Sequence, residues 1–203
     1  MNAVPRVAVT DHGRRTRERL VDGAAELIRI QGVEKTSLDQ ILARTGTSKS
    51  QLYHYFADKD GLVRAVIARQ ADSILDQSTT AMEAVRSWAT LRVWFDAIVA
   101  AQAADGCRHG CPVGSLAAEL ADHNDRARGD LAQSFERWER AIRVLLERLK
   151  SAGRLGARAD TRALATTTLT AIQGGLLLSK TYRDPEPLRR ALDANYSYLR
   201  SFG

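Results

Sequence analysis

The stretch EKTSLDQILARTGTSKSQLYHYFADKDGL, residues 34–62, decides the fold of this chain. Within it, Ser37 and Gln40 have the spacing of a capping box, and apolar residues follow at helical spacing, so a short helix is expected. Gly46 ends that helix, and the hydroxyl residues after it can cap a second short helix over residues 49–55. Two short helices joined by a tight turn containing glycine are the arrangement of a helix-turn-helix.

The residues upstream predict one longer helix before this pair. Over residues 14–31, apolar side chains recur at three- and four-residue spacing, and Gly32 supplies the stop. The residues before position 14 are expected to form a mobile tail. Three helices are therefore expected in the N-terminal part of the chain.

The second short helix carries side chains whose chemistry suits DNA. Ser50 and Gln51 are short enough to reach base edges in a major groove, whereas Lys49 and Tyr53 suit phosphates. The helix N-terminus also presents unpaired N–H groups, which favour an anion. The predicted DNA-contacting residues are Arg14, Arg15, Ser37, Thr47, Ser48, Lys49, Ser50, Gln51, Tyr53, His54 and Lys59.

This segment resembles the DNA-binding domain of the TetR family over roughly fifty continuous residues. The resemblance includes the Leu-Tyr-His-Tyr-Phe block at residues 52–56 and Lys59, three residues after it. It implies a three-helix head over residues 14–59, followed by a linking helix from about residue 58 to residue 77.

The same resemblance implies two domains. Residues 1–58 form the DNA-binding domain, and residues 59–203 form a domain for ligand binding and dimerisation. Gln51 stands where the family commonly has Thr, so the resemblance does not predict the base that it faces. A three-helix core with an aromatic patch and no role in DNA binding is the alternative interpretation.

Charge and composition add only weak support. The net charge is +6, but residues 1–60 carry ten Lys or Arg against eight Asp or Glu, a net of only +2. No apolar segment near the N-terminus suits a signal peptide, and the uncharged run at residues 163–179 is short and polar for a membrane span. A cytoplasmic protein with reduced thiols and no membrane partner is expected.

Helical periodicity fills the rest of the chain, so the sequence predicts an all-α fold of about nine helices. Beyond the linking helix, the regulatory domain is expected to be a helical bundle. Its predicted helices span residues 82–104, 113–121, 124–151, 160–182 and 187–201.

The last two of these helices carry the predicted dimer surface. Gly174 and Gly175 in mid-helix cost roughly 1 kcal/mol each against Ala, so a close backbone approach is expected there. In TetR relatives such a helix pair meets its two-fold mate as a four-helix bundle, and a homodimer reads both halves of a palindrome. An intramolecular core without a partner is the alternative. The predicted dimer residues are Leu164, Thr168, Ala171, Gly175, Leu178, Leu188, Leu192, Tyr196 and Leu199.

Large aromatic side chains lie on the helices that surround a ligand cavity in the TetR family. An aromatic residue on an apolar helix face is usually part of the core, so about half of these are expected only to pack. The aromatic residues favour a flat apolar molecule, and Thr170 and Gln173 are the polar groups best placed to orient it. The predicted pocket residues are Trp88, Trp94, Phe95, Ile98, Cys111, Phe135, Trp138, Ile142, Thr170 and Gln173.

The segment GCRHGCPVG, residues 106–114, is the most unusual one outside the head. With the residues after it, it resembles a motif of the LmrA/YxaF-like branch of TetR regulators. The simplest interpretation is that Cys111 packs at the start of a helix while Cys107 is an incidental thiol. Alternatively, the loop gates the ligand pocket.

Two chemical interpretations of this loop also remain open. In a thiol switch, Arg108 and the helix beginning at about residue 113 lower the pKa of Cys107 or Cys111. In a metal site, these thiols act with His109 and His123, although this spacing is not a common zinc spacing.

An enzyme that pairs a cysteine with His109 or His123 is the alternative from a different class. It would need an orienting third group and an oxyanion site, and the sequence contains no P-loop, dinucleotide fingerprint or zinc-protease motif. A nonspecific DNA-packaging protein would carry far more Lys and Arg.

The sequence therefore predicts a sequence-specific DNA-binding regulator without catalytic residues, cofactor or metal. We expect a homodimeric repressor that binds double-stranded operator DNA with palindromic symmetry and is released by a small-molecule effector. Redox or electrophile sensing through Cys107 and Cys111 is the alternative mode of regulation.

Overall fold

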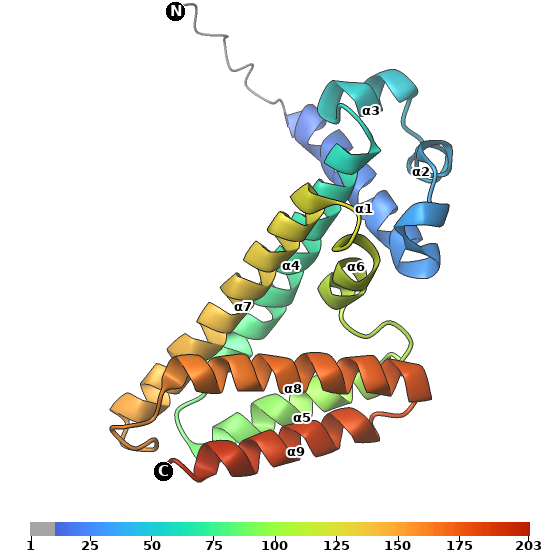
Figure 1. Ribbon diagram of the computed structural model, residues 1–203. Helices are drawn as coiled ribbons and strands as arrows, with labels where there is room; N and C mark the ends of the chain where they lie inside the picture. Colours follow the sequence, from blue (N-terminus) through green and yellow to red (C-terminus); the bar gives the residue numbers. More distant parts are fainter. Residues whose placement is uncertain (1–10) are drawn as a thin grey trace, which may run out of the picture. The chain divides into compact units, whose positions relative to one another are not determined.

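The computed structural model describes residues 11–203, which form nine α-helices and no strand (Figure 1). The helices are α1 (Asp11–Lys35), α2 (Leu38–Thr45), α3 (Lys49–Tyr55), α4 (Lys59–Glu83), α5 (Trp88–Ala104), α6 (Pro112–Leu120), α7 (Asp125–Ser151), α8 (Thr161–Tyr182) and α9 (Glu186–Arg200). The predicted all-α fold is confirmed. The predicted tail falls mainly on residues 1–10, which lie outside the described residues, whereas residues 11–13 belong to α1.

Local signals define the two short helices of the head. Both begin with complete capping boxes, at Ser37 for α2 and at Ser48 for α3. Gly46 then ends α2 in the left-handed conformation, with φ at 62°. Gly32 interrupts α1 at the predicted stop, because its backbone is not helical, with φ at 83°, and a short helical segment follows it to Lys35.

The helix predicted over residues 82–104 is wrong at its start. The preceding helix, α4, continues to Glu83, and α5 begins only at Trp88. Ser87 caps α5, because its Oγ accepts the N–H of Thr90 at 3.3 Å while its own N–H donates to the Thr90 hydroxyl at 3.0 Å. Apolar residues are buried on both sides of the break between α4 and α5. The apolar periodicity of the sequence therefore continues across the break and does not reveal it.

Contacts divide the chain inside α4 into two compact units, Met1–Arg69 and Gln70–Gly203. Leu62 and Ile67, on the first turns of α4, are fully buried. This part of α4 therefore belongs to the core of the first unit, which extends beyond residue 58, where the sequence predicts the domain boundary.

In the second unit, α8 packs against both α7 and α9, and α5 packs against α9 (Figure 1). Gly175 permits the close approach of α8 and α9. A Cβ atom at this position would lie only 2.9 Å from the Cα and 2.7 Å from the Cδ1 of Leu188. A buried hydrogen bond of 3.0 Å from the amide nitrogen of Asn195 to the hydroxyl of Thr168 joins the same two helices.

This packing corrects most of the predicted dimer surface. The apolar faces of α8 and α9 cover each other within one chain, so their side chains are not available to a second copy. The predicted dimer residues buried in this way are Leu164, Thr168, Gly175, Leu188, Leu192 and Leu199. Ala171 and Tyr196 are half-buried, and Leu178 remains 44% exposed.

None of the helices within residues 11–203 combines the length and the apolar character needed to cross a membrane.

Candidate functional site

Two buried side chains anchor α3 to the head. Leu52 is fully buried and Phe56 is only 4% exposed. The N–H of Phe56 ends the helix by donating to the carbonyl of Leu52 at 2.9 Å, and the guanidinium of Arg17 lies 5.3 Å from the centre of the Phe56 ring. These contacts hold one face of α3 inward and leave the other face accessible.

The accessible face of α3 brings together five of the eleven predicted DNA-contacting residues. The side chains that it presents carry two hydroxyls, an amine, an imidazole and a phenol, and none of them is acidic. Tyr53 is 48% exposed although it is aromatic. The exposed residues of this face are Ser48, Lys49, Ser50, Tyr53 and His54.

The capping box of α3 engages one further predicted residue. The hydroxyl of Ser48 accepts the N–H of Gln51 at 3.1 Å, and the side-chain carbonyl of Gln51 accepts the N–H of Ser48 at 2.9 Å. Gln51 is therefore half-buried and held against the start of its own helix.

The other predicted residues of the head lie on α1 and α2. Ser37 is exposed at the start of α2, and the side-chain nitrogen of Arg14 forms a 3.0 Å ion pair with Asp11. Arg15 is also exposed and lines a groove described below.

Two further predicted DNA-contacting residues form contacts within the head. Thr47 is 92% buried, and its hydroxyl lies 2.7 Å from that of Thr45, so it stabilises the turn between α2 and α3. The amine of Lys59 donates to the carbonyl of Val33 at 2.6 Å and so ties the start of α4 to the end of α1. The sequence does not show these two contacts, because both form only when the head folds.

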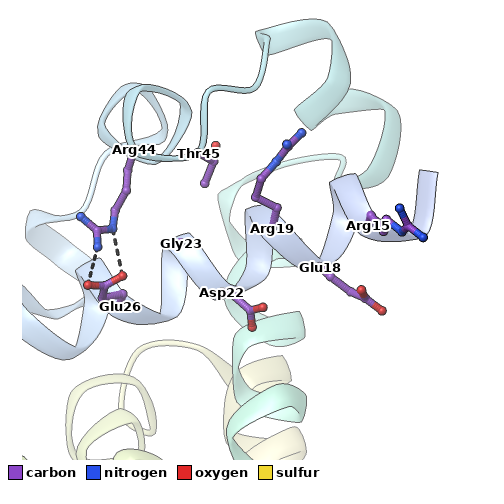
Figure 2. Close-up of a pocket in the computed structure, with 8 residues that line it drawn as sticks. All are labelled: Arg15, Glu18, Arg19, Asp22, Gly23, Glu26, Arg44 and Thr45. Carbon is purple, nitrogen blue, oxygen red and sulfur yellow. Dashed lines mark hydrogen bonds and ion pairs between the residues drawn. The ribbon is translucent and has the colours of Figure 1, made fainter. Parts of the chain in front are cut away.

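A charged groove lies between α1 and α2 on the head (Figure 2). Arg44 binds the carboxylate of Glu26 through two nitrogens, and its Nε lies 3.1 Å from Oε2 of Glu26. Hydrogen bonding from Arg44 lowers the pKa of Glu26. The carboxylate of Asp22 pairs with Arg69 at 3.0 Å. The lining residues are Arg15, Glu18, Arg19, Asp22, Gly23, Glu26, Arg44 and Thr45.

Arg15 and Arg19 form no ion pair with an acid among residues 11–203, whereas two of the three acids of the groove are already paired. In Figure 2 the side chain of Arg19 points away from Glu18 and Asp22. Arg19 is not among the predicted DNA-contacting residues, although it lines this groove with Arg15. The signal was present, because residues 15 and 19 are one helical turn apart and lie on neighbouring positions of one face.

In the second unit, several of the predicted pocket residues are buried. Trp94 and Phe95 on α5 are 4% and 1% exposed, with ring centres 5.2 Å apart. On α7, Ile142 is fully buried and Trp138 is 7% exposed. The indole nitrogen of Trp138 is buried and has no hydrogen-bond partner within residues 11–203. Ile98 and Phe135 are half-buried.

Two predicted pocket residues lie elsewhere. Trp88 packs edge-to-face on Tyr196 at 6.1 Å, and its carbonyl accepts the hydroxyl of Tyr196, so it belongs to the contact between α5 and α9. Thr170 is exposed, and its hydroxyl donates to the carbonyl of Thr166 in its own helix. Thr170 therefore does not lie among the buried aromatic residues of this unit.

Cys111 is buried at the start of α6, as the simplest interpretation of the cysteine loop predicts. Its sulfur accepts the N–H of Gly114 at 3.3 Å and the amide of Gln173 at 3.5 Å. Cys107 is also buried, and its carbonyl accepts a hydrogen bond from Arg183 at 3.1 Å. The loop is thus tied to α8 at two places.

The environment of both thiols argues against a thiol switch. Burial raises the pKa of Cys107, and the carboxylates of Asp184 and Asp105 raise it further, against the opposing charge of Arg183. Burial also raises the pKa of Cys111 and outweighs the hydrogen bonds that its sulfur accepts. The predicted lowering of a thiol pKa by Arg108 or by the start of α6 is wrong.

The metal interpretation of this loop is not supported either. Within the described part of the chain, no group of three His, Cys, Asp or Glu side chains is placed to hold a metal ion. The Nδ1 of His109 instead lies 2.8 Å from a carboxylate oxygen of Asp105. Burial raises the pKa of Asp105, but the hydrogen bonds from His109 outweigh this effect and lower it overall.

Comparisons with known families agree on both halves of the chain. Residues 20–66 match the family model described as bacterial regulatory proteins, tetR family. Residues 87–194 match the model described as transcriptional regulator LmrA/YxaF-like, C-terminal domain.

Curated relatives extend over most of the chain. An uncharacterized HTH-type transcriptional regulator of Mycobacterium tuberculosis is 31% identical over 180 residues, which are 85% of this chain and 88% of the relative. The transcriptional regulator AcuR of Cereibacter sphaeroides is 29% identical over 194 residues, 92% of this chain and 83% of AcuR. The HTH-type transcriptional regulator LmrA of Bacillus subtilis is 27% identical over 175 residues, 85% of this chain and 90% of LmrA.

Solved structures share the fold. The regulatory protein TetR from Rhodobacter sphaeroides superposes with a TM-score of 0.80 at 25% identity, covering 91% of this chain and 98% of its own. A TetR-family regulator from Cytophaga hutchinsonii superposes with a TM-score of 0.82 at 16% identity, covering 95% and 97% of the two chains.

Proposed function

Because the chain belongs to the TetR family of transcriptional regulators, we propose that it is a homodimeric repressor that a small-molecule effector releases from a palindromic operator. Its relatives are transcriptional regulators, not enzymes. The observation that carries the proposal is the accessible face of α3, which presents short polar side chains and a lysine without an acid.

The division of labour along α3 follows from side-chain chemistry. Lys49 carries a compact positive charge for a phosphate, and the exposed phenol of Tyr53 adds a neutral donor. Ser50 and Gln51 are uncharged and short, which suits base edges in a major groove. Phosphate contacts stabilise binding to every sequence, whereas base contacts discriminate between sequences.

A second copy of the chain would cover the outer face of α8. This face is uncharged between Arg162 and Lys180, yet Leu177 is 63% exposed and Leu178 is 44% exposed. A Cβ atom added at Gly174, on the same face, would have no neighbour within 4 Å. The exposed glycine and leucines therefore favour a close helix contact between two chains, in place of the buried residues first predicted.

For release by an effector, α4 is the natural connecting element. It is one continuous helix of 25 residues that contributes to both compact units. An effector that binds one arrangement of the regulatory unit more tightly than another shifts the population toward that arrangement. Movement of α4 would then take the two heads out of register with successive major grooves.

A mobility-shift assay on the DNA upstream of its own gene tests this proposal, with random DNA as competitor. We expect a complex that resists the competitor and weakens steeply with salt. Lys49→Ala is expected to weaken binding to all sequences. The control is Arg140→Ala, which deletes an exposed positive charge on α7, in the second unit. If neither this DNA nor selection from a random library gives a specific complex, the proposal fails.

The effector step has its own test. A thermal-shift screen of flat aromatic compounds against the full-length dimer is expected to find stabilising ligands. Those ligands are then added to the mobility shift. Stabilising ligands that leave the DNA complex intact would contradict release by such an effector.

A further inference from the structure

The side chain of Gln51 is oriented by its own helix. Its Oε1 accepts the N–H of Ser48 at 2.9 Å, and among residues 11–203 its amide nitrogen has no hydrogen-bond partner. The hydrogen bond also identifies the two ends of the amide, because exchanging them would place an amide nitrogen against the N–H of Ser48.

This orientation separates the two functions of the amide. A glutamine that reads adenine in the usual bidentate way needs its carbonyl to accept from N6 and its nitrogen to donate to N7. In this chain the carbonyl is turned back to the capping box, so the free end offers N–H groups alone. Such a donor matches guanine best, because both O6 and N7 of guanine accept; thymine offers O4 alone, and adenine offers N7 alone beside its N6 donor.

Building on the proposed function, we propose that Gln51 is a specificity-determining residue that favours guanine over thymine and adenine, and disfavours cytosine, whose N4 is a donor. Guanine comes first because it offers two acceptors to one NH₂ group. The capping box holds the carbonyl of Gln51, so only the amide nitrogen is available to a base. This orientation thereby determines which base is preferred at one position of the operator.

Selection of bound sequences from a random DNA library tests this inference, using the full-length chain and the variants Gln51→Ala and Gln51→Glu. The operator position at which Gln51→Ala changes the base distribution is the position that Gln51 contacts. We expect the original chain to favour guanine over adenine there by about fivefold or more, the low end of the usual range for a base contact.

Gln51→Glu is the sharper variant. Glutamate is a common third residue of a capping box, so α3 should form equally well, and the melting temperature checks this. The carboxylate offers acceptors only, so the preference for guanine should disappear and shift toward cytosine, whose N4 is a donor.

The matched control is Gln40→Glu in the capping box of α2. The carbonyl of Gln40 accepts the N–H of Ser37 at 2.8 Å and an amide N–H of Gln31 at 3.0 Å, so the same substitution is made at the same helical position. It should leave the base preferences unchanged.

A preference for adenine or cytosine at the Gln51 position in the original chain would overturn the inference. An unchanged base distribution in Gln51→Ala would overturn it too, because Gln51 would then contact no base. Absence of any enriched sequence with the original chain is a different result, since it rejects the proposed function itself.

Discussion

The approach of α8 to α9 predicts opposite fates for two adjacent glycines. A Cβ at Gly175 would meet the backbone of Leu188 at 2.9 Å, and backbone atoms cannot move aside as the tip of a side chain can. A Cβ at Gly174 would meet no other atom of the described residues, 11–203, within 4 Å. We therefore expect Gly175→Ala to force the two helices apart and Gly174→Ala to be tolerated within the chain.

Comparing the two variants isolates the packing effect. Both replace glycine by alanine in the same helix, so each gains the same helix propensity of about 1 kcal/mol. Overpacking a tight contact costs about 1–3 kcal/mol, which makes Gly175→Ala less stable than Gly174→Ala by that amount. For a chain of 203 residues this difference corresponds to about 2–12 °C in melting temperature.

Thermal and urea unfolding of both variants, at several protein concentrations, measures this difference. The concentration series separates folding within a chain from dimer dissociation, because only the latter varies with concentration. Equal stabilities, or a more stable Gly175→Ala, would refute the packing argument. If Gly174→Ala is the more damaging variant, the tightest approach lies between two chains.

Three further predictions concern other parts of the molecule. Asp105→Asn should lower the melting temperature at pH 7, because the pKa of Asp105 is lowered in the folded chain and its ionised carboxylate therefore stabilises the fold. The difference in melting temperature should vanish as the pH falls below about 4, because Asp105 then becomes protonated. Cys107 and Cys111 should react with a disulfide reagent far more slowly in the native chain than in urea, because burial raises the pKa of both thiols; fast native labelling would revive the thiol switch. Arg19→Ala should weaken binding to all DNA and reduce the salt slope by about 1, whereas an unchanged slope would exclude a phosphate contact.

The parts of the head that the sequence predicts correctly are those that depend on near neighbours. The capping boxes at Ser37 and Ser48 involve residues three positions apart, so the sequence pattern already contains both partners. The role of Lys59 depends on packing and was not predictable. Lys59 binds the carbonyl of Val33, which is 26 residues away, and only the folded head brings the two together.

The break between α4 and α5 shows a second limit of sequence patterns. Apolar periodicity records which residues are buried, and Met82 and Val85 are buried on either side of the point where α4 ends. Burial continues across the break, but the backbone conformation does not. The cap at Ser87 is the local signal that the periodicity conceals.

For α8, the sequence predicts a close approach but not its partner. Adjacent residues on a helix point about 100° apart, so Gly174 and Gly175 cannot serve the same neighbour. Gly175 faces α9 of its own chain, where Leu188 fills the space that a side chain would need. Gly174 remains on the uncharged outer face with Leu177 and Leu178. The dimer contact that we propose therefore uses the residues beside the predicted ones, because folding within the chain takes up the predicted face first.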